Sequence, residues 1–229
     1  MKISNDTLNI LSSFTDLNNQ IQVKPGSNLV TVSSTNSVLA NAKIPETFDQ
    51  EFCIYDLSQF LSAVSMFESP DFDFSDKTVN VSNGSGSFFT YVYADPRTIV
   101  VPPKDKLGIV GEDVSFSVSA DTLKSLFKAA AVLSLPNIVV RNNNNDNLEM
   151  NAEDVKNPTS NKYVGNITEN ALFPSASDFQ FVFKVDNMKF LDMDYDVKII
   201  SDKKVAYFYN DVIEYWVALE HNDTYFNLE

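Results

Sequence analysis

Hydrophobic residues recur every three or four positions in a segment close to the start of the chain. Ile10, Leu11 and Phe14 fall on one face of a helix. Ser4 precedes them and is a residue type that commonly caps helix N-termini. The pattern predicts a helix over residues 4–17, with its apolar face turned toward the rest of its domain.

The same arrangement returns in the second half of the chain. The run Ser119-Ala120-Asp121-Thr122-Leu123 repeats Ser4-Asn5-Asp6-Thr7-Leu8 at an offset of 115 residues, half of the 229-residue length. Each run follows a β-branched apolar residue and opens a helical pattern, and the second helix is expected to end before Pro136. A repeat of this length indicates a duplicated domain.

Outside these helices, short apolar runs bounded by turn-forming residues predict strands. In the first half they fall at 21–24, 29–33, 38–44 and 51–55 and, after a helix that begins at Asp56, at 71–74, 79–82 and 87–94. In the second half they fall at 114–118, 137–141, 148–152, 162–167 and 179–185 and, after a short helix that opens at Asp186, at 194–200, 205–210 and 213–219. From its first helix onward, each half therefore contains a helix, four strands, a helix and three strands; the strand at 114–118 precedes the first helix of the second half. This order predicts an α+β fold in which both helices cover one face of a sheet.

Composition narrows the class of protein. A hydrophobic content of 44% and an aromatic content of 12% are too high for a disordered chain. No apolar run approaches the roughly 18 residues of a membrane span, and the N-terminus lacks a signal-peptide core. The only cysteine, Cys53, fits a reducing cytoplasm. A net charge of −14 argues against wrapping nucleic acid with the general surface, although a local basic face remains compatible with it.

The polar faces of the helices are less acidic than the chain as a whole. Lys124 and Lys128, four residues apart, lie opposite an expected buried stripe of Leu123, Leu126, Phe127, Ala130 and Leu133. Lys2 lies at the start of the first helix, and Lys189 lies within the short helix that opens at Asp186. These faces indicate a surface that approaches phosphates; a solvated helix face is the alternative interpretation.

No motif indicates catalysis. Asp192, Asp194 and Asp196 alternate like a strand edge and lack the glycine and closing glutamate of a calcium loop, so we expect no metal. His221 is the only histidine and lies in a polar tail, and Cys53 lies in an apolar strand typical of a core. We therefore expect neither enzymatic activity nor a cofactor.

Five segments, taken in order, resemble a known family. They are Lys2-Ile3-Ser4, Tyr55-Asp56-Leu57, Thr98-Ile99-Val100-Val101-Pro102, Asn187-Met188-Lys189 and Tyr215-Trp216-Val217-Ala218-Leu219-Glu220. In this order and at matching length they resemble the sliding clamp of the tailed-phage replisome. The resemblance implies the DNA-clamp fold, with two similar domains that carry antiparallel sheets on the outside and two helices on the inner face. It places an N-terminal domain at 1–103, a connector at 104–113 and a C-terminal domain at 114–229.

The resemblance also implies a function and its partners. Clamps of this family are homotrimeric rings that surround duplex DNA and tether the DNA polymerase by its C-terminal peptide. A clamp loader and, in relatives, late-transcription factors are further partners, and the cytoplasm of an infected bacterial host is the expected location. By position, Lys2, Lys128 and Lys189 match basic positions of the family, whereas Lys124 is assigned to the DNA-facing side from the helical pattern alone.

A partner-peptide site is expected where the connector meets the C-terminal strand. The resemblance assigns to it Val100, Val101, Pro102, Trp216 and Leu219. Packing of the domain junction is the alternative role for these residues. For the whole chain, the alternatives are a β-rich phage structural protein of the tail or baseplate and, more weakly, a hydrolase that uses the aspartate clusters.

Overall fold

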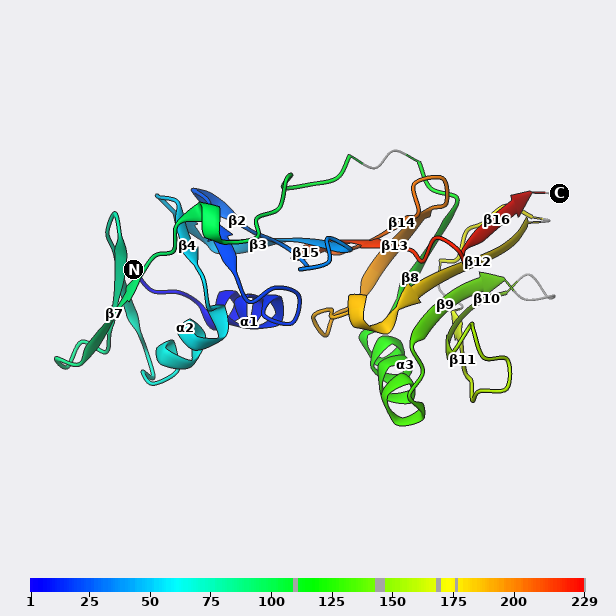
Figure 1. The fold of residues 1–229 in the computed structure, drawn as a ribbon, viewed down its shortest axis with the longest axis horizontal. Coiled ribbons are helices and arrows are strands. Elements are labelled where there is room, and N and C mark those ends of the chain that lie inside the picture. The colour runs from blue at the N-terminus through cyan, green and yellow to red at the C-terminus, as the bar shows by residue number, and fades with distance from the viewer. Residues whose placement is uncertain (109–110, 143–146, 168–169, 176, 229) are drawn as a thin grey trace. The chain divides into compact units, whose positions relative to one another are not determined.

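The computed structural model separates the chain into two units, Met1–Lys106 and Leu107–Glu229 (Figure 1). It describes residues 1–108, 111–142, 147–167, 170–175 and 177–228. Each unit combines antiparallel sheets with few helices, as the sequence pattern predicts.

The first unit contains the two predicted helices, and both begin where the sequence predicts. Helix α1 (Asn5–Phe14) starts after Ser4, whose hydroxyl accepts a hydrogen bond from the Thr7 N–H. Helix α2 (Leu57–Val64) starts after Asp56, whose carboxylate accepts one from the Gln59 N–H at 2.8 Å. α1 ends three residues before the expected position, because residues 15–18 form turns that close on the last helical carbonyls.

Seven strands complete this order. They are β1 (Ile21–Val23), β2 (Gly26–Val32), β3 (Val38–Phe48), β4 (Phe52–Ile54), β5 (Asp71–Phe74), β6 (Thr78–Ser82) and β7 (Phe88–Val92). β1 pairs with β4, β2 with β3, and β5, β6 and β7 form a three-stranded sheet, all antiparallel. β3 continues four residues beyond its expected end at Ile44, and a 3₁₀ turn, η1 (Pro96–Thr98), follows β7.

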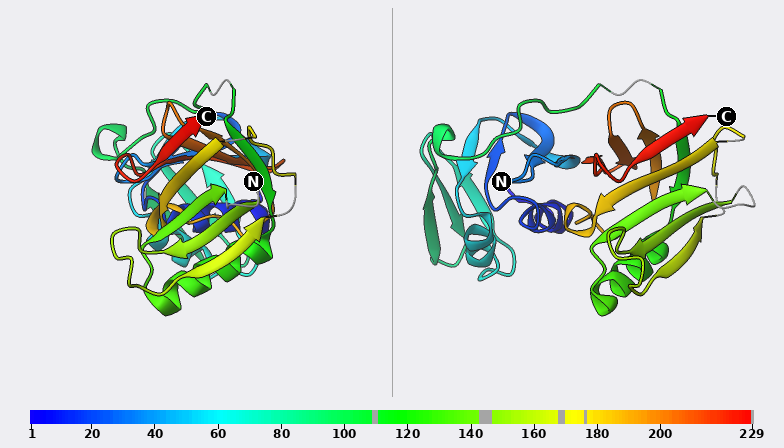
Figure 2. Two further views of the ribbon diagram at one scale, coloured as in Figure 1. Left: turned by 90° about the vertical axis from the view of Figure 1, so that its right-hand side faces the viewer. Right: turned by 45° about the vertical axis from the view of Figure 1, so that its right-hand side comes forward.

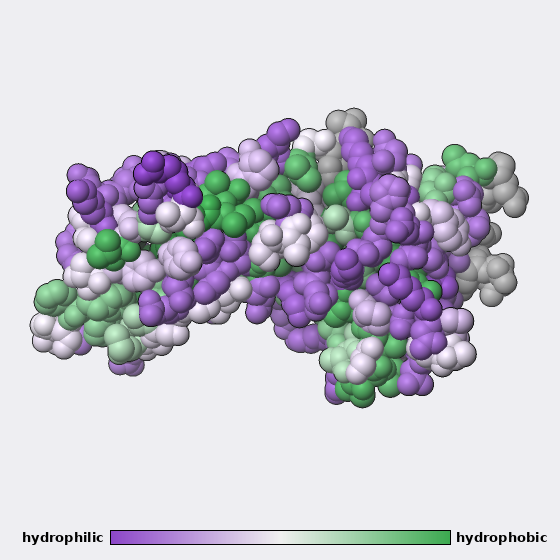
Figure 3. Space-filling view, in the orientation of Figure 1, coloured by the Kyte–Doolittle hydropathy of each residue, from purple (hydrophilic) through white to green (hydrophobic). Residues whose placement is uncertain are grey.

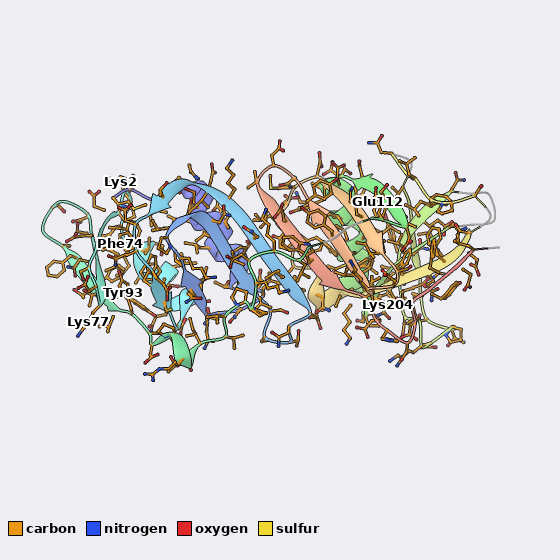
Figure 4. All side chains as sticks on the ribbon, turned by 90° about the horizontal axis from the view of Figure 1, so that it is seen from above. Lys2, Phe74, Lys77, Tyr93, Glu112 and Lys204 are labelled. Carbon is orange, nitrogen blue, oxygen red and sulfur yellow. The ribbon has the colours of Figure 1, made fainter. Side chains whose placement is uncertain are left out.

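Aromatic side chains fill one part of the core of this unit. The ring of Phe52 lies 5.1 Å from that of Phe74 and 5.3 Å from that of Tyr93 (Figure 4). Cys53, the next residue, is buried, as the sequence predicts. Burial is the main reason that the pKa of its thiol rises to about 11, and the nearby charges of Glu51 and Asp95 raise it further. The thiol therefore stays protonated at neutral pH.

The second unit repeats the order and adds two strands, one before its helix and one at its end. Its elements are β8 (Val114–Val118), α3 (Ala120–Leu133), β9 (Asn137–Asn142), β10 (Leu148–Glu153), β11 (Tyr163–Ile167), β12 (Ser177–Lys184), η2 (Val185–Asn187), β13 (Tyr195–Ile200), β14 (Val205–Tyr209), β15 (Ile213–Ala218) and β16 (Tyr225–Leu228). One sheet has the order β11-β10-β9-β12-β16, and in the other β8, β13, β14 and β15 pair in succession.

Three expectations for this unit are wrong. The short helix at Asp186 is only the 3₁₀ turn η2, so Lys189 lies beyond it and not within a helix. The polar tail forms strand β16, which pairs with β12. Leu133 is exposed and not part of the buried stripe, because Ser134 takes a left-handed conformation that ends α3 beside it.

Helix α3 packs against the β9–β11 side of its sheet (Figure 2). Leu126 is fully buried there. On β11, a Cβ at Gly165 would lie 2.9 Å from the Met150 carbonyl oxygen and 3.7 Å from a Leu126 methyl. Glycine at this position therefore keeps a side chain away from the backbone of the neighbouring strand β10, while the distance to Leu126 is ordinary packing.

Glu46, near the end of β3, holds the N-terminus of α1. Its carboxylate accepts hydrogen bonds from the Ser4 N–H and from the hydroxyl of the fully buried Thr7, both at 2.5 Å. Burial alone would raise the pKa of Glu46, but the hydrogen bonds from Thr7 and Ser4 outweigh it and hold the pKa below its ordinary value of 4.5. Because the folded pKa is lowered, the charged carboxylate stabilises the fold above the unfolded pKa, and this contribution is lost as pH falls through the folded pKa.

We expect Glu46→Gln to lower the free energy of unfolding at neutral pH by about 1 kcal/mol, because one amide oxygen replaces a charged acceptor of two hydrogen bonds. Urea unfolding at several pH values measures this difference in unfolding free energy between the variant and the wild type. The difference should shrink as the pH falls below 4.5, the ordinary pKa of the carboxyl group. Glu68→Gln is the matched control, because Glu68 is exposed and has no hydrogen bond or ion pair among the described residues. An undiminished deficit at about pH 3 would contradict the role of the charge.

Candidate functional site

The outward face of α3 presents two lysines. Leu123, Leu126 and Ala130 are buried on the inner face, with exposed fractions of 4% or less. Lys124 and Lys128 are exposed on the opposite face, as the helical pattern predicts. The 3.6-residue period of the helix places them one turn apart, so the two ammonium groups occupy neighbouring positions on one surface.

The three alternating aspartates after η2 hold the N-terminal end of α3. Asp194 accepts a hydrogen bond from the Ala120 N–H at 2.8 Å, and Asp196 accepts one from the Ser117 hydroxyl at 2.7 Å. Asp192 forms an ion pair with Lys124. The hydrogen bond and charge of Asp192 raise the pKa of Lys124. Each carboxylate therefore has a partner on β8 or α3, a role that the sequence spacing alone did not reveal.

The other two lysines expected to face DNA differ in their contacts. The Lys2 ammonium lies 3.0 Å from the Asp71 carboxylate and 2.8 Å from the Ser69 carbonyl oxygen. Lys189 is exposed in the segment after η2. Within the described part of the chain, neither Lys189 nor Lys128 has an ion pair. Two of the four lysines are thus neutralised by a carboxylate, and two are not.

Residues 100–102, just before the connector, are held by their backbone, and the two valines expose their side chains. The Val100 N–H donates to the Gln20 side chain at 2.9 Å, and the Val100 carbonyl accepts from the Asn18 side chain at 3.3 Å. Val100 and Val101 are 42% and 36% exposed. Pro102 lines a cavity of about 250 Å³, whose rim carries a 2.7 Å ion pair between Lys24 and Asp105.

Trp216 and Leu219, in the second unit, are buried, with 3% and 6% of their surface exposed. The Trp216 ring stacks on Tyr207 at a centroid distance of 5.1 Å, and Tyr207 stacks on Tyr209 at 4.6 Å. Among the residues that the structure describes, the indole N–H of Trp216 has no hydrogen-bond partner. These side chains contribute to the packing of the sheet formed by β13–β15.

The described residues contain no cluster of three or more His, Cys, Asp or Glu side chains that could hold a metal ion. None of the helices formed by those residues has both the length and the hydropathy needed to span a bilayer. Cys53 is buried with a raised thiol pKa, and His221 is exposed in a turn. The features that carry functional information are therefore the outward face of α3 and residues 100–102.

Comparison with solved structures defines the class of fold. Proliferating cellular nuclear antigen (PCNA) from Entamoeba histolytica matches with a TM-score of 0.70 at 10% identity, over 93% of this chain and 94% of that one. PCNA from A. fulgidus, solved with the C-terminal region of FEN-1 bound, matches with a TM-score of 0.67 at 14% identity, with the same coverage of each chain. The fold is that of the DNA clamps, as the sequence resemblance implied.

Sequence comparison identifies the branch of this class. Residues 115–221 match the family described as "gp45 sliding clamp, C terminal". The sliding clamp of Vibrio phage KVP40 is 29% identical over 96% of this chain and 99% of its own length, and that of Escherichia phage RB69 is 27% identical over 98% and 99%. Over its whole length the chain is thus similar to the sliding clamps of tailed phages, and these matches support a non-enzymatic polymerase processivity factor. These full-length matches disfavour a tail or baseplate protein.

Proposed function

We propose that this clamp closes as a homotrimer around duplex DNA and tethers the replicative DNA polymerase through the polymerase's C-terminal peptide. The observation that carries the proposal is the outward lysine pair on α3, a local basic surface in a chain of net charge −14. Such a chain is repelled by DNA over most of its surface and attracted only where lysines gather.

The first unit offers one surface for ring closure. Strand β7 lies at the end of its sheet order, and Phe88 and Val92 on it are 66% and 69% exposed. Met66, just after α2, is 67% exposed, and the Phe67 ring stacks on Phe89 of β7 at 6.0 Å. An edge strand with apolar side chains beside it is a surface that proteins normally cover.

The second unit offers a surface of the same kind. Strand β11 lies at the end of its sheet order, and Val164 on it is 51% exposed. The end of α3, which packs against β11, exposes Val132 (74%) and Leu133 and forms an apolar patch (Figure 3). Pairing β7 of one copy with β11 of the next is a head-to-tail contact, and such contacts form a ring when the rotation closes.

Residues 100–102, just before the connector, support peptide binding. Val100 and Val101 present apolar side chains from a backbone fixed by Asn18 and Gln20, and Pro102 leads into the adjacent cavity. A short apolar peptide could lie along this segment, a common mode of peptide recognition. Trp216 and Leu219, the other two residues that the resemblance assigned to this site, are buried within the second unit.

Further partners follow from the type of protein. A closed ring needs a clamp loader to open it around DNA, and late-transcription factors would bind the clamp as a coactivator. The protein would act in the cytoplasm of the infected bacterium, where its single buried thiol stays reduced.

We expect Phe88→Asp and Val164→Asp each to convert a trimer into monomers, because each places a charge in an apolar contact between copies. Sedimentation at several concentrations measures it. Leu228→Asp is the control: Leu228 is 64% exposed on β16, the opposite edge of the sheet that carries β11, and should leave the trimer intact. A wild-type chain that stays monomeric at tens of micromolar would refute the ring.

We expect retention on DNA to be topological, because only two of the four candidate DNA-facing lysines, Lys128 and Lys189, lack an ion pair among the described residues, and they neutralise few phosphates. Clamp loaded on a nicked circle should survive moderate salt and leave once the circle is cut. The measurement is the fraction bound before and after linearisation. Equal rates of loss from circular and linear DNA would show that charge, and not enclosure, holds the protein.

We expect Lys124→Glu with Lys128→Glu to reduce loading and processive synthesis, most strongly at low salt, where screening is weakest. Both side chains are exposed opposite the buried stripe, so the cost in folding free energy should stay within about 0.5 kcal/mol. Primer extension measures the effect, and size and melting temperature serve as controls. Unchanged synthesis at low salt would mean that α3 does not face DNA.

A further inference from the structure

Asp192 is held against the outward face of α3 by its own segment. The side chains of Phe190, Leu191 and Met193 line a cavity of about 90 Å³ together with Leu123 and Phe127 of α3. The segment therefore lies alongside the first turns of the helix. Asp192 and Lys124, which form the ion pair, are both largely exposed, with 55% and 63% of their side-chain surface accessible.

Contacts with the protein interior fix the backbone on either side of Asp192. The Leu191 N–H donates to the Tyr215 hydroxyl at 3.2 Å, and the Leu191 carbonyl accepts from the Tyr195 hydroxyl at 2.8 Å. Asp194 is bonded to the Ala120 N–H. Because Tyr195 and Tyr215 are buried, the position of Asp192 beside Lys124 is imposed by the fold and does not depend on the weak attraction of an exposed ion pair.

We propose that Asp192 is a built-in counter-charge that weakens the contact of Lys124 with duplex DNA, leaving Lys128 as the more effective lysine on this helix. The inference rests on the proposed function, in which α3 faces DNA. A phosphate that approaches Lys124 also meets the Asp192 carboxylate, and, from the first turn of α3, that of Asp121. The Lys124 ammonium and the Asp192 carboxylate lie much closer together than the Debye length of about 8–10 Å. Their attraction and repulsion of an approaching phosphate therefore nearly cancel.

Such cancellation suits a ring that moves along DNA. A protein retained by enclosure gains nothing from strong phosphate contacts, since each must break for every step. The Asp192 carboxylate repels phosphate, whereas the few lysines attract it. Other interfaces combine attractive and repulsive groups in the same way to set their selectivity. Its position therefore adjusts how firmly the inner surface holds the duplex.

The test is a mutant cycle on the full-length protein, with a short fluorescein-labelled duplex as the probe and anisotropy as the readout. Asp192→Asn should bind the duplex several-fold more tightly at low salt. Its plot of log K against log salt should steepen by about 0.9 for each lysine that gains a phosphate contact. Asp192→Ser should behave in the same way, and Asp192→Glu, which keeps the charge, should resemble wild type. In a Lys124→Gln background, Asp192→Asn should give no gain.

Asp202→Asn is the matched control, because it makes the same charge change at an exposed turn elsewhere in the unit. An equal gain from Asp202→Asn, or a gain from Asp192→Asn that persists in the Lys124→Gln background, would overturn the inference. A separate result bears on the proposed function: if Lys124→Gln and Lys128→Gln both leave duplex binding unchanged, α3 does not face DNA. If the lysine variants weaken binding but Asp192→Asn changes nothing, only the counter-charge role fails.

Discussion

The burial of one face of α3 against its sheet is the contact on which the functional surface of the second unit depends. Leu126 is fully enclosed, and the absence of a side chain at Gly165 avoids a clash with the Met150 carbonyl oxygen of the neighbouring strand β10. This packing fixes the rotation of the helix about its axis. Lys124 and Lys128 then face outward because a helix has only one apolar stripe to bury.

The same packing orders the segment after η2. Its apolar side chains lie against α3, and its aspartates bond to the start of that helix and to β8. Stabilising the helix N-terminus with carboxylates is favourable, because the first N–H groups of a helix lack partners within it. One consequence is that a negative charge stands beside a lysine on the outward face. Structural support and control of surface charge are combined in one short segment.

Sequence reasoning located most elements because their signals are local. Ser4, Asp56 and Ser119 cap helices as expected, and strands Asp71–Phe74 and Val114–Val118 have the predicted bounds. Strand β16 was missed because it is only four residues long and mostly exposed, and only pairing with β12 makes it a strand. The fourth helix was overestimated, because the segment after Asp186 bends to bring Phe190 onto Tyr215 at 4.6 Å.

The sequence by itself determined the duplicated order of elements, the capped helices, the acidic balance and, through five ordered segments, the class of protein. Periodicity also identified Lys124 and Lys128 as outward residues. Only the tertiary structure decided which lysines remain unpaired, because Lys124 meets Asp192, and Lys2 meets Asp71, across long separations in the chain. Local patterns can predict the face on which a charge lies, whereas the partner of that charge depends on which distant segments the fold brings beside it.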